Sequence, residues 1–502
     1  MLDKNNQYAK IKFKIDTEVM RHLFEGTLVR DADRIPIDIV PSHRVPSRCC
    51  IYKERAVVRY RIMALAGYTL ETDDDEYRTL SSYMEEAMEE DKPKLPLFTT
   101  IAVGCSSCPK SKYQVSDACR SCFARPCSTN CPKDAIEYVG GKAHINEDKC
   151  IKCGKCAKAC SYNAIIHLER PCQASCGMDA IGVDNNGKAV INQDKCVACG
   201  QCLVSCPFGA IVDKGQIFQV IQSILKGDQV IAILAPAFIG QFTQLVSPGK
   251  LVTGMKMLGF DQVVEVAIGA DMCTIEEARD FLEKVPEEQN YMATSCCPAW
   301  HEMIYKLFPS ETGKISMTLT PMVFTARLMK KEHPGCKVVF VGPCAAKKLE
   351  AIREDIRSDV DFVLTFEELM GMFEAKEVDF SSIPESDLLN LGTAAGRGFA
   401  VSGGVAGAVT NLIQQQYPGT QVQTARAEGL RECRKLMTMA RAGKLNGYLI
   451  EGMACPGGCV AGAGTILPIE KAQKFVEKYA AEARTASPLE SPYRDVGKGL
   501  GD

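Results

Sequence analysis

The sequence predicts a protein of three parts: a small helical region over residues 1–98, a cysteine-rich segment over 99–215, and an α/β domain over 216–502. Two observations lead to this division. Cysteines become frequent between Cys105 and Cys206, and beyond residue 215 short apolar runs alternate with helical periodicity. Such alternation is typical of parallel strands joined by helices. The chain of 502 residues is long enough to form several domains.

The first region is expected to contain two amphipathic helices, over 54–70 and 77–90, because apolar side chains recur there with helical spacing. The run Lys92-Pro93-Lys94-Leu95-Pro96 interrupts this pattern and marks the boundary of the region. Its cysteines are Cys49 and Cys50. The sequence assigns this region no function.

The cysteine-rich segment contains an internal repeat. The first unit has Cys127, Cys131, Cys150, Cys153, Cys156 and Cys160, and the second has Cys172, Cys176, Cys196, Cys199, Cys202 and Cys206. Both units contain the spacing C-x2-C-x2-C-x3-C, in which three thiolates hold one iron–sulfur cubane and the fourth reaches another. The repeat predicts a duplicated supersecondary unit.

This crossing pattern divides sixteen cysteines into four sets of four. The sets are Cys131, Cys150, Cys153 and Cys156; Cys119, Cys122, Cys127 and Cys160; Cys176, Cys196, Cys199 and Cys202; and Cys105, Cys108, Cys172 and Cys206. The segment resembles the polyferredoxin-like domains of electron-transfer subunits, and about four 4Fe–4S clusters are expected. One alternative is a two-cluster ferredoxin, in which Cys160 joins the Cys196 group and Cys206 the Cys150 group. Zinc is a second alternative, although a third cysteine at x2 spacing fits zinc poorly.

Charge and composition argue against several classes of function. The net charge of −3 gives no reason to expect a nucleic acid or an anionic membrane as partner. The polar start predicts no secretory signal, and no run of about eighteen apolar residues predicts a membrane span. In a chain that is not exported, the 26 cysteines are expected to stay reduced and to bind metal, so the predicted compartment is the cytoplasm.

Apolar runs in the last domain are expected to form strands at 230–234, 262–268, 337–341 and 447–450, with helices over 217–225, 275–285 and 471–483. The end from Ser487 onward is expected to be loosely ordered. Loops that contain candidate functional residues follow three of the strands, at 235–237, 342–344 and 451–459. Binding sites usually lie at this carboxyl edge of parallel strands.

Three cysteine motifs carry the most specific information. They are Thr294-Ser295-Cys296-Cys297-Pro298-Ala299-Trp300, Pro343-Cys344-Ala345-Ala346-Lys347-Lys348-Leu349-Glu350, and Glu451-Gly452-Met453-Ala454-Cys455-Pro456-Gly457-Gly458-Cys459. Four of these thiols, from Cys297, Cys344, Cys455 and Cys459, suffice to hold one cubane. The fifth thiol, Cys296, is not needed as a ligand, and its position next to one suggests a role in proton transfer. Together and in this order, the motifs resemble the signature segments of iron-only (FeFe) hydrogenases over about residues 216–465.

The resemblance implies a catalytic domain of two lobes of parallel sheet flanked by helices, with the active-site cluster in the cleft. It implies an H-cluster, which is a 4Fe–4S cubane joined to a diiron subsite with carbonyl, cyanide and a dithiolate bridge. The four motif cysteines would hold the cubane, and Cys459 would bridge the two parts. The implied reaction is the reversible reduction of protons to H2, with maturation proteins delivering the subsite. A ferredoxin-type carrier is the expected electron partner, since no G-x-G-x-x-G fingerprint follows a strand.

The resemblance also implies roles for residues near the cluster. Cys296 matches the family's proton-transfer cysteine, and a thiol with a reference pKa of about 8.5 exchanges protons near neutral pH. Lys347 matches a lysine that donates a hydrogen bond to one cyanide. The segment Ala235-Pro236-Ala237 matches the loop whose backbone amides contact the other cyanide. Met453 is also expected to contact the cofactor. The plain structural alternatives are a buried cysteine at 296 and an ordinary strand–helix turn at 235–237.

A path for protons to the surface is implied by three further matches. Glu277 and Ser316 match a carboxylate and a serine of the family, and Asp280 stands in place of the outer glutamate. Glu277 and Asp280 are three residues apart and so share one helix face, which also fits two solvent-facing carboxylates.

The motifs depart from the common family pattern, which indicates a divergent branch. Gly342 replaces a methionine before Pro343, Ala463 replaces a glycine, and Met322 replaces a glutamine. Two alternative functions are a hydrogenase-like iron–sulfur assembly protein without the diiron subsite, and a sensor of H2. Assembly proteins of that kind lack the first cysteine of the TSCC pair, and sensors usually carry an added signalling domain.

Overall fold

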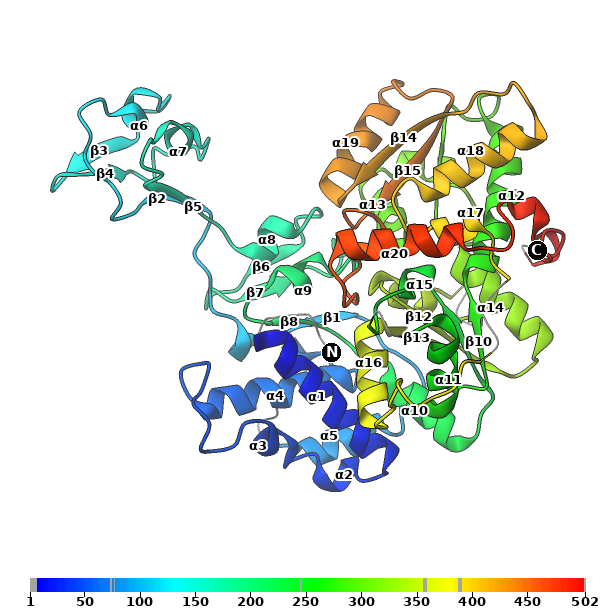
Figure 1. Ribbon diagram of the computed structural model, residues 1–502. Coiled ribbons are helices and arrows are strands. Elements are labelled where there is room, and N and C mark those ends of the chain that lie inside the picture. Colours follow the sequence, from blue (N-terminus) through cyan, green and yellow to red (C-terminus); the bar gives the residue numbers. More distant parts are fainter. Residues whose placement is uncertain are drawn as a thin grey trace.

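The computed structural model describes residues 7–72, 75, 77–243, 246–354, 359–386 and 391–500. Figure 1 shows three parts: a helical N-terminal region, an extended cysteine-rich arm, and an α/β domain with two sheets. Within these described ranges, no helix is both long enough and apolar enough to cross a membrane.

The N-terminal region consists of helices. They are α1 (Gln7–Phe24), α2 (Leu28–Asp31), α3 (Ile35–Ile39), α4 (Ile51–Leu65) and α5 (Leu80–Ala87). The two helices expected from the sequence correspond to α4 and α5, although both are shorter than predicted. Helix α1 packs on a helix of the α/β domain and was not predicted, because its buried face includes the polar residues Asp16 and Thr17.

The arm is built from short strand pairs, as a duplicated iron–sulfur unit requires. The antiparallel pairs are β1 (Phe98–Thr100) with β8 (Ile211–Asp213), β2 (Lys112–Val115) with β5 (Ile165–Leu168), β3 (Ile136–Val139) with β4 (Lys142–Ile145), and β6 (Ile181–Val183) with β7 (Ala189–Ile191). Short helices carry the cysteine motifs: α6 (Pro126–Thr129), α7 (Lys155–Ala159), α8 (Pro171–Ser175) and α9 (Gln201–Ser205). The first unit stands away from the rest of the molecule, whereas the second lies beside the α/β domain (Figure 1).

Two parallel sheets form the α/β domain, which confirms the predicted fold class. One sheet has the order β10 (Gln262–Glu265), β9 (Val230–Leu234), β12 (Lys337–Gly342), β13 (Phe362–Thr365), and the other the order β11 (Met292–Ala293), β15 (Tyr448–Met453), β14 (Gln423–Glu428). Helices flank them: α10 (Ile217–Lys226), α11 (Pro248–Leu258), α12 (Ala267–Lys284), α13 (Pro298–Leu307), α14 (Pro321–Glu332), α15 (Ala346–Ile352), α16 (Phe366–Ala375), α17 (Ala394–Gly398), α18 (Gly404–Gln416), α19 (Leu430–Arg441) and α20 (Ile469–Ala481).

The structure corrects two local expectations. The apolar run at 262–268 is a strand only to Glu265, and α12 begins at Ala267 instead of residue 275. Apolar runs do not distinguish a buried strand from a buried helix, and the start of α12 is buried on all sides. The prediction of a loose end after Ser487 is also wrong. The side chain of Leu500 is buried, and Arg327 donates a hydrogen bond to its carbonyl at 2.6 Å.

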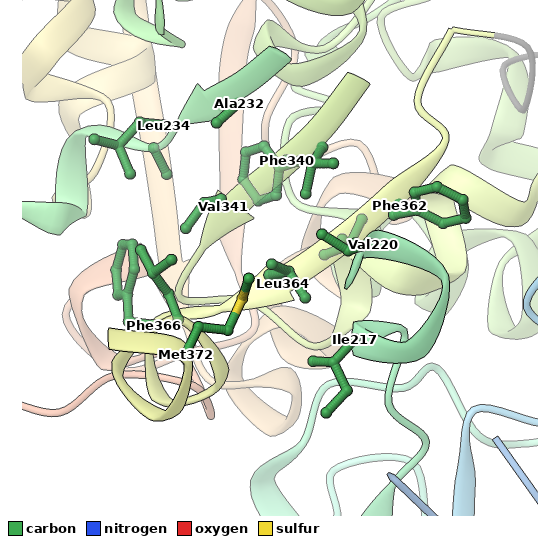
Figure 2. Packing of buried hydrophobic residues seen from close by; sticks show 14 of the residues in the cluster. Ile217, Val220, Ala232, Leu234, Phe340, Val341, Phe362, Leu364, Phe366 and Met372 are labelled. Carbon is green, nitrogen blue, oxygen red and sulfur yellow. The ribbon is translucent and has the colours of Figure 1, made fainter. Parts of the chain in front are cut away.

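The first sheet is buried on both faces. All of β9 is inaccessible to solvent. On one face of the sheet, Phe362 and Leu364 of β13 lie near Ile217 and Val220 of α10 (Figure 2). Full burial of side chains of this size stabilises a fold by about 1.5–3 kcal/mol each. The sheet is therefore a rigid base for the loops that follow its strands.

A buried ammonium connects the arm to this base. Lys348 of α15 is fully buried, and its Nζ lies 2.8 Å from Asp213 Oδ2 of β8 and 3.0 Å from Glu368 Oε1 of α16. Removing one partner from such a network leaves an uncompensated buried charge, which costs about 3–5 kcal/mol. The last strand of the arm is thereby held against the helix that follows Cys344.

Candidate functional site

The three cysteine motifs meet at one cavity between the two sheets. Cys296 and Cys297 follow β11, Cys344 follows β12, and Cys455 and Cys459 follow β15. All of these cysteines line the cavity together with Ala235, Pro236, Ala237, Lys347 and Met453. The structure thus brings together the ten residues that the sequence analysis places around a cluster.

Close backbone contacts hold the loops around this cavity. Gly458 has a φ of +92°, and a Cβ there would lie 2.5 Å from the amide nitrogen of Ser402. A Cβ on Gly462 would lie 2.3 Å from the carbonyl oxygen of Pro343. Only glycine fits at both positions, so the loop that carries Cys459 lies directly on the loop that carries Cys344.

The chemistry of the four thiols fits a polynuclear iron centre. Burial, followed by the proximity of Cys297, raises the pKa of Cys344 to about 11, and burial and neighbouring thiols raise the pKa of Cys455 and Cys459 further. Four thiolates in this space therefore need a cationic core between them. Among the described residues, no three His, Cys, Asp or Glu side chains converge as they would around a single metal ion.

Lys347 is held beside the cavity by a buried carboxylate. Its Nζ donates to Glu350 Oε2 at 2.6 Å, and Thr320 Oγ1 donates to Glu350 Oε1 at 2.5 Å. Burial disfavours the ammonium, but Glu350 outweighs this effect and raises the pKa of Lys347. Sequence reasoning assigned no role to Glu350, although its position three residues after Lys347 on a helix was a usable signal.

A second thiol lies beside Cys296. The hydrogen bond with Cys273 of α12, together with burial, raises the pKa of Cys296 well above its ordinary value. Cys273 lies one helical turn before Glu277, so both side chains project from the same face of α12. The sequence analysis did not select Cys273, because a single cysteine in an apolar helix is usually structural.

Glu277 is fully buried, and neither of its carboxylate oxygens has a hydrogen-bond partner of ordinary geometry. The Ser316 hydroxyl and the Ser295 amide are its nearest polar neighbours and favour ionisation. Burial nevertheless dominates and raises the pKa of Glu277 to about 8. The carboxyl group is therefore mostly protonated at neutral pH.

The outer part of the predicted proton path reaches partly exposed residues. Ser316 is buried next to Glu277. Beyond it, Thr318 Oγ1 lies 3.5 Å from Asp280 Oδ2, and Asp280 pairs with Lys284 at 3.2 Å. Cys296 thus lines the cavity, Glu277 and Ser316 are buried, and Asp280 is partly exposed.

The cysteines of the arm lie in local groups. Cys172 lies near Cys105, Cys108 and Cys206; Cys202 near Cys176, Cys196 and Cys199; Cys156 near Cys131 and Cys150; and Cys119, Cys122, Cys127 and Cys160 line one small cavity. Cys160 belongs to the projecting first unit, away from the Cys196 group that the two-cluster alternative requires.

The second unit of the arm touches the central cavity directly. Gln201 Nε2 lies 3.7 Å from the Sγ atom of Cys455. Burial raises the pKa of the Cys199 thiol, and the proximity of Cys297 raises it further. Thiols of the arm and thiols of the cavity are therefore near neighbours. This proximity suits electron transfer between two metal centres.

Known protein families match all three cysteine-bearing segments. Residues 228–463 match the family "Iron only hydrogenase large subunit, C-terminal domain", and residues 142–165 and 189–212 match 4Fe–4S binding domains. Iron hydrogenase 1 of Clostridium pasteurianum is 27% identical over 386 residues, which are 66% of this chain and 67% of that protein.

Two further relatives differ in their named roles. The NADP-reducing hydrogenase subunit HndD of Solidesulfovibrio fructosivorans is 29% identical over 309 residues, covering 50% of this chain and 53% of that protein. Cytosolic iron-sulfur assembly component 3 of Bos taurus is 26% identical over 299 residues, covering 48% of this chain and 63% of that protein. This chain thus spans between about half and two thirds of the length of these three relatives.

Glu277→Gln should make the stability of the protein less dependent on pH. The raised pKa means that the folded protein keeps a proton that the unfolded chain releases above about pH 4.5. The stabilisation is complete below that pH and is lost as pH rises through about 8. The melting temperature of the wild type should therefore fall relative to that of the variant between about pH 5 and 8, and the difference should level off above that range.

The matched control is Glu276→Gln, which changes a neighbouring carboxylate that pairs with Arg279 at 2.6 Å. Its melting temperature should follow the pH dependence of the wild type. A difference between Glu277→Gln and wild type that stays constant from pH 5 to 9 would show that Glu277 titrates normally.

Proposed function

Because residues 228–463 form a domain of the iron-only hydrogenase large-subunit family, we propose that this protein is an FeFe hydrogenase that catalyses the reversible reduction of protons to H2. The observation that carries the proposal is the convergence of four ligand thiols and a fifth thiol, Cys296, on one cavity. A cluster-binding assembly protein needs the four ligands alone. The additional thiol is the feature that favours catalysis.

The four cysteines Cys297, Cys344, Cys455 and Cys459 would hold the cubane of an H-cluster, with Cys459 as the bridge to the diiron subsite. When bound, this group supplies the redox chemistry and an open iron position for hydrogen. The rest of the cavity wall is largely apolar, with Pro236, Met322, Phe340, Phe399 and Val405 among its side chains. These residues exclude water from the site.

Two polar contacts of the chain would orient the anionic cluster. The Lys347 ammonium borders the cavity, and its ion pair with Glu350 fixes its direction. In the segment 235–237, Pro236 has no N–H, and the Ala235 amide already donates to the Val341 carbonyl at 2.9 Å. Ala237 is therefore the residue of this segment whose amide remains to face the cofactor.

Protons would move between the cavity and the solvent through the chain's own side chains. Cys296 exchanges a proton with the site, Glu277 holds a proton at neutral pH, and the Ser316 hydroxyl both donates and accepts. Asp280, which is partly exposed, is the outer end of the path. The hydrogen-bonded neighbour Cys273 positions Cys296.

Electrons would reach the site through four 4Fe–4S clusters held by the four cysteine sets of the arm. The second unit contacts Cys455, and the first unit projects into solvent, so electrons would pass from the first unit through the second unit to the site. A ferredoxin-type protein is the proposed carrier, maturation proteins deliver the diiron subsite, and the cytoplasm is the proposed compartment.

The iron-sulfur assembly relative supports a second candidate, an assembly protein without the diiron subsite. Infrared spectroscopy of protein matured under anaerobic conditions separates the two. We expect carbonyl and cyanide bands in the wild type and their absence in Cys459→Ser, because a hydroxyl is a harder and far less acidic ligand than a thiol. Wild-type protein without such bands would favour the assembly function. Normal bands in Cys459→Ser would show that Cys459 is not the bridge to the diiron subsite.

Iron analysis tests the number of clusters. Protein lacking the diiron subsite should contain about twenty iron atoms per chain, from five cubanes of four iron atoms each. Cys108→Ala should remove about four of them, because Cys108 belongs to a single cysteine set. About twelve iron atoms in the wild type would instead indicate two ferredoxin clusters and one catalytic cubane.

Cys296→Ala should keep the infrared bands while H2 turnover falls about a hundred- to ten-thousandfold, the usual contribution of a general acid–base group. Cys296→Asp should recover part of the activity, because a carboxyl group of similar length also carries a proton. Cys336→Ala is the control, since Cys336 is a buried cysteine that does not line the cavity. Loss of the bands in Cys296→Ala would show a ligand or structural role, and full activity would place the proton path elsewhere.

A further inference from the structure

The projecting unit of the arm differs in charge from the rest of the protein. Residues 111–168 contain nine lysines and arginines and five aspartates and glutamates, a net charge of +4. The whole chain has a net charge of −3, so the remainder carries −7. The lysine, arginine, aspartate and glutamate side chains of this module therefore sum to a positive charge, whereas those of the body sum to a negative charge, and the module stands away from the body (Figure 1).

The positive charge is concentrated at the cluster-binding loops. Lys152, Lys155 and Lys158 alternate with the cysteines of the second half of the unit, and Arg120 lies between Cys119 and Cys122. All four cations are exposed, and none forms an ion pair within the described part of the chain. Three of the five acidic residues are already paired with other lysines: Asp117 with Lys142, Glu137 with Lys149, and Glu147 with Lys112.

The internal repeat shows that cluster binding does not require these lysines. Ala198, Gln201 and Val204 occupy the positions in the second unit that Lys152, Lys155 and Lys158 occupy in the first. In the second unit Ala198 is buried and Gln201 contacts Cys455 of the α/β domain, whereas Val204 is 61% exposed. The three positions are therefore uncharged in the unit that lies beside the α/β domain and positive in the unit that projects into solvent.

Apolar side chains accompany the cations. The Phe123 side chain follows Cys122 directly and is completely exposed, and Ile151 and Tyr162 are more than half exposed. Exposed aromatic and cationic side chains are together a usual composition of protein–protein contacts. Nothing within the described residues covers Phe123.

We propose that Arg120, Phe123, Lys152, Lys155 and Lys158, here called the lysine face, bind a one-electron carrier protein with an acidic surface. The proposal rests on the proposed function, because it names the partner that exchanges electrons with the site. A carrier on this face lies against the cysteine sets of the first unit. The positive charge steers an acidic partner to the arm, while the negative body repels it from other surfaces.

The test uses the triple variant Lys152→Ala, Lys155→Gln, Lys158→Val, which installs the side chains of the second unit at matching positions. Stopped-flow absorbance measures reduction of the clusters in the full chain by a reduced acidic plant-type ferredoxin. At low ionic strength the second-order rate constant should fall about tenfold or more. At about 1 M salt, where the Debye length is only about 3 Å, variant and wild type should converge.

Two further variants separate the contribution of the apolar Phe123 contact from that of charge, and the local effect of the three lysines from that of net charge. Phe123→Ala should weaken ferredoxin binding at high as well as low salt, because the lost contact is apolar. The matched control Lys256→Gln, Lys444→Gln, Lys474→Gln removes three exposed lysines of the α/β domain and should react like the wild type. An equal effect of the two triple variants would mean that net charge alone acts, and would overturn the lysine face.

Wild-type protein provides a test that does not depend on the folding of any variant. Electron transfer from the dithionite-reduced protein to cytochrome c, a basic carrier, should accelerate with added salt, whereas the reaction with ferredoxin should slow. Identical salt dependence for the two carriers would overturn the proposal. So would a triple variant that loses binding to vesicles of phosphatidylserine and phosphatidylcholine while its reaction with ferredoxin is unchanged, because the face would then be a membrane contact.

The readout is reduction of the arm clusters and does not require H2 turnover. If infrared spectroscopy finds no diiron subsite, the hydrogenase proposal fails while the stopped-flow result still decides the docking proposal. In a matured protein, H2 production driven by methyl viologen, a small cation that needs no docking surface, reports the catalytic site separately.

Discussion

The structure depends on one geometric requirement: four thiols from three chain segments must meet around a single space. Each segment follows a strand of a parallel sheet, and the two sheets direct these strand ends toward the same cavity. Functional constellations tolerate displacements of only about 0.5 Å. The contacts of Gly458 with Ser402 and of Gly462 with Pro343 meet this demand, because they leave no room for the loops to separate.

The same requirement explains the buried charges between the arm and the α/β domain. A buried ion pair is often no more stabilising than apolar side chains of the same volume, but it permits few alternative arrangements. Lys348 contacts Asp213 of the arm and Glu368 of α16, and it follows Cys344 by four residues. The network therefore fixes the position of the arm relative to Cys344, which we propose as a cluster ligand. A fixed position of this kind would serve the proposed electron transfer between the arm and the cavity.

The sequence predicted the features that leave local signatures. The C-x2-C-x2-C-x3-C spacing identified the arm, and the strands at 230–234 and 337–341 were recognised from apolar runs of suitable length. The features it missed depend on tertiary contacts. Helix α1 buries Asp16, which a periodicity argument counts as exposed, and Cys273 gains a role only because α12 places it against Cys296. A residue whose function comes from a partner distant in the chain has no pattern of its own.

The departures from the family pattern become understandable as compensating changes in packing. A Cβ on Gly342 would lie 2.5 Å from the Phe340 ring and 3.1 Å from Ala235, so the ring occupies the space that a methionine at 342 would need. Phe340 also lines the cavity, and its bulk thus replaces that of the missing side chain. Similarly, the Ala463 methyl fills the space beside Gly200 of the arm. The substitutions around the cavity therefore preserve its apolar wall and its contact with the arm while they change which residues supply them.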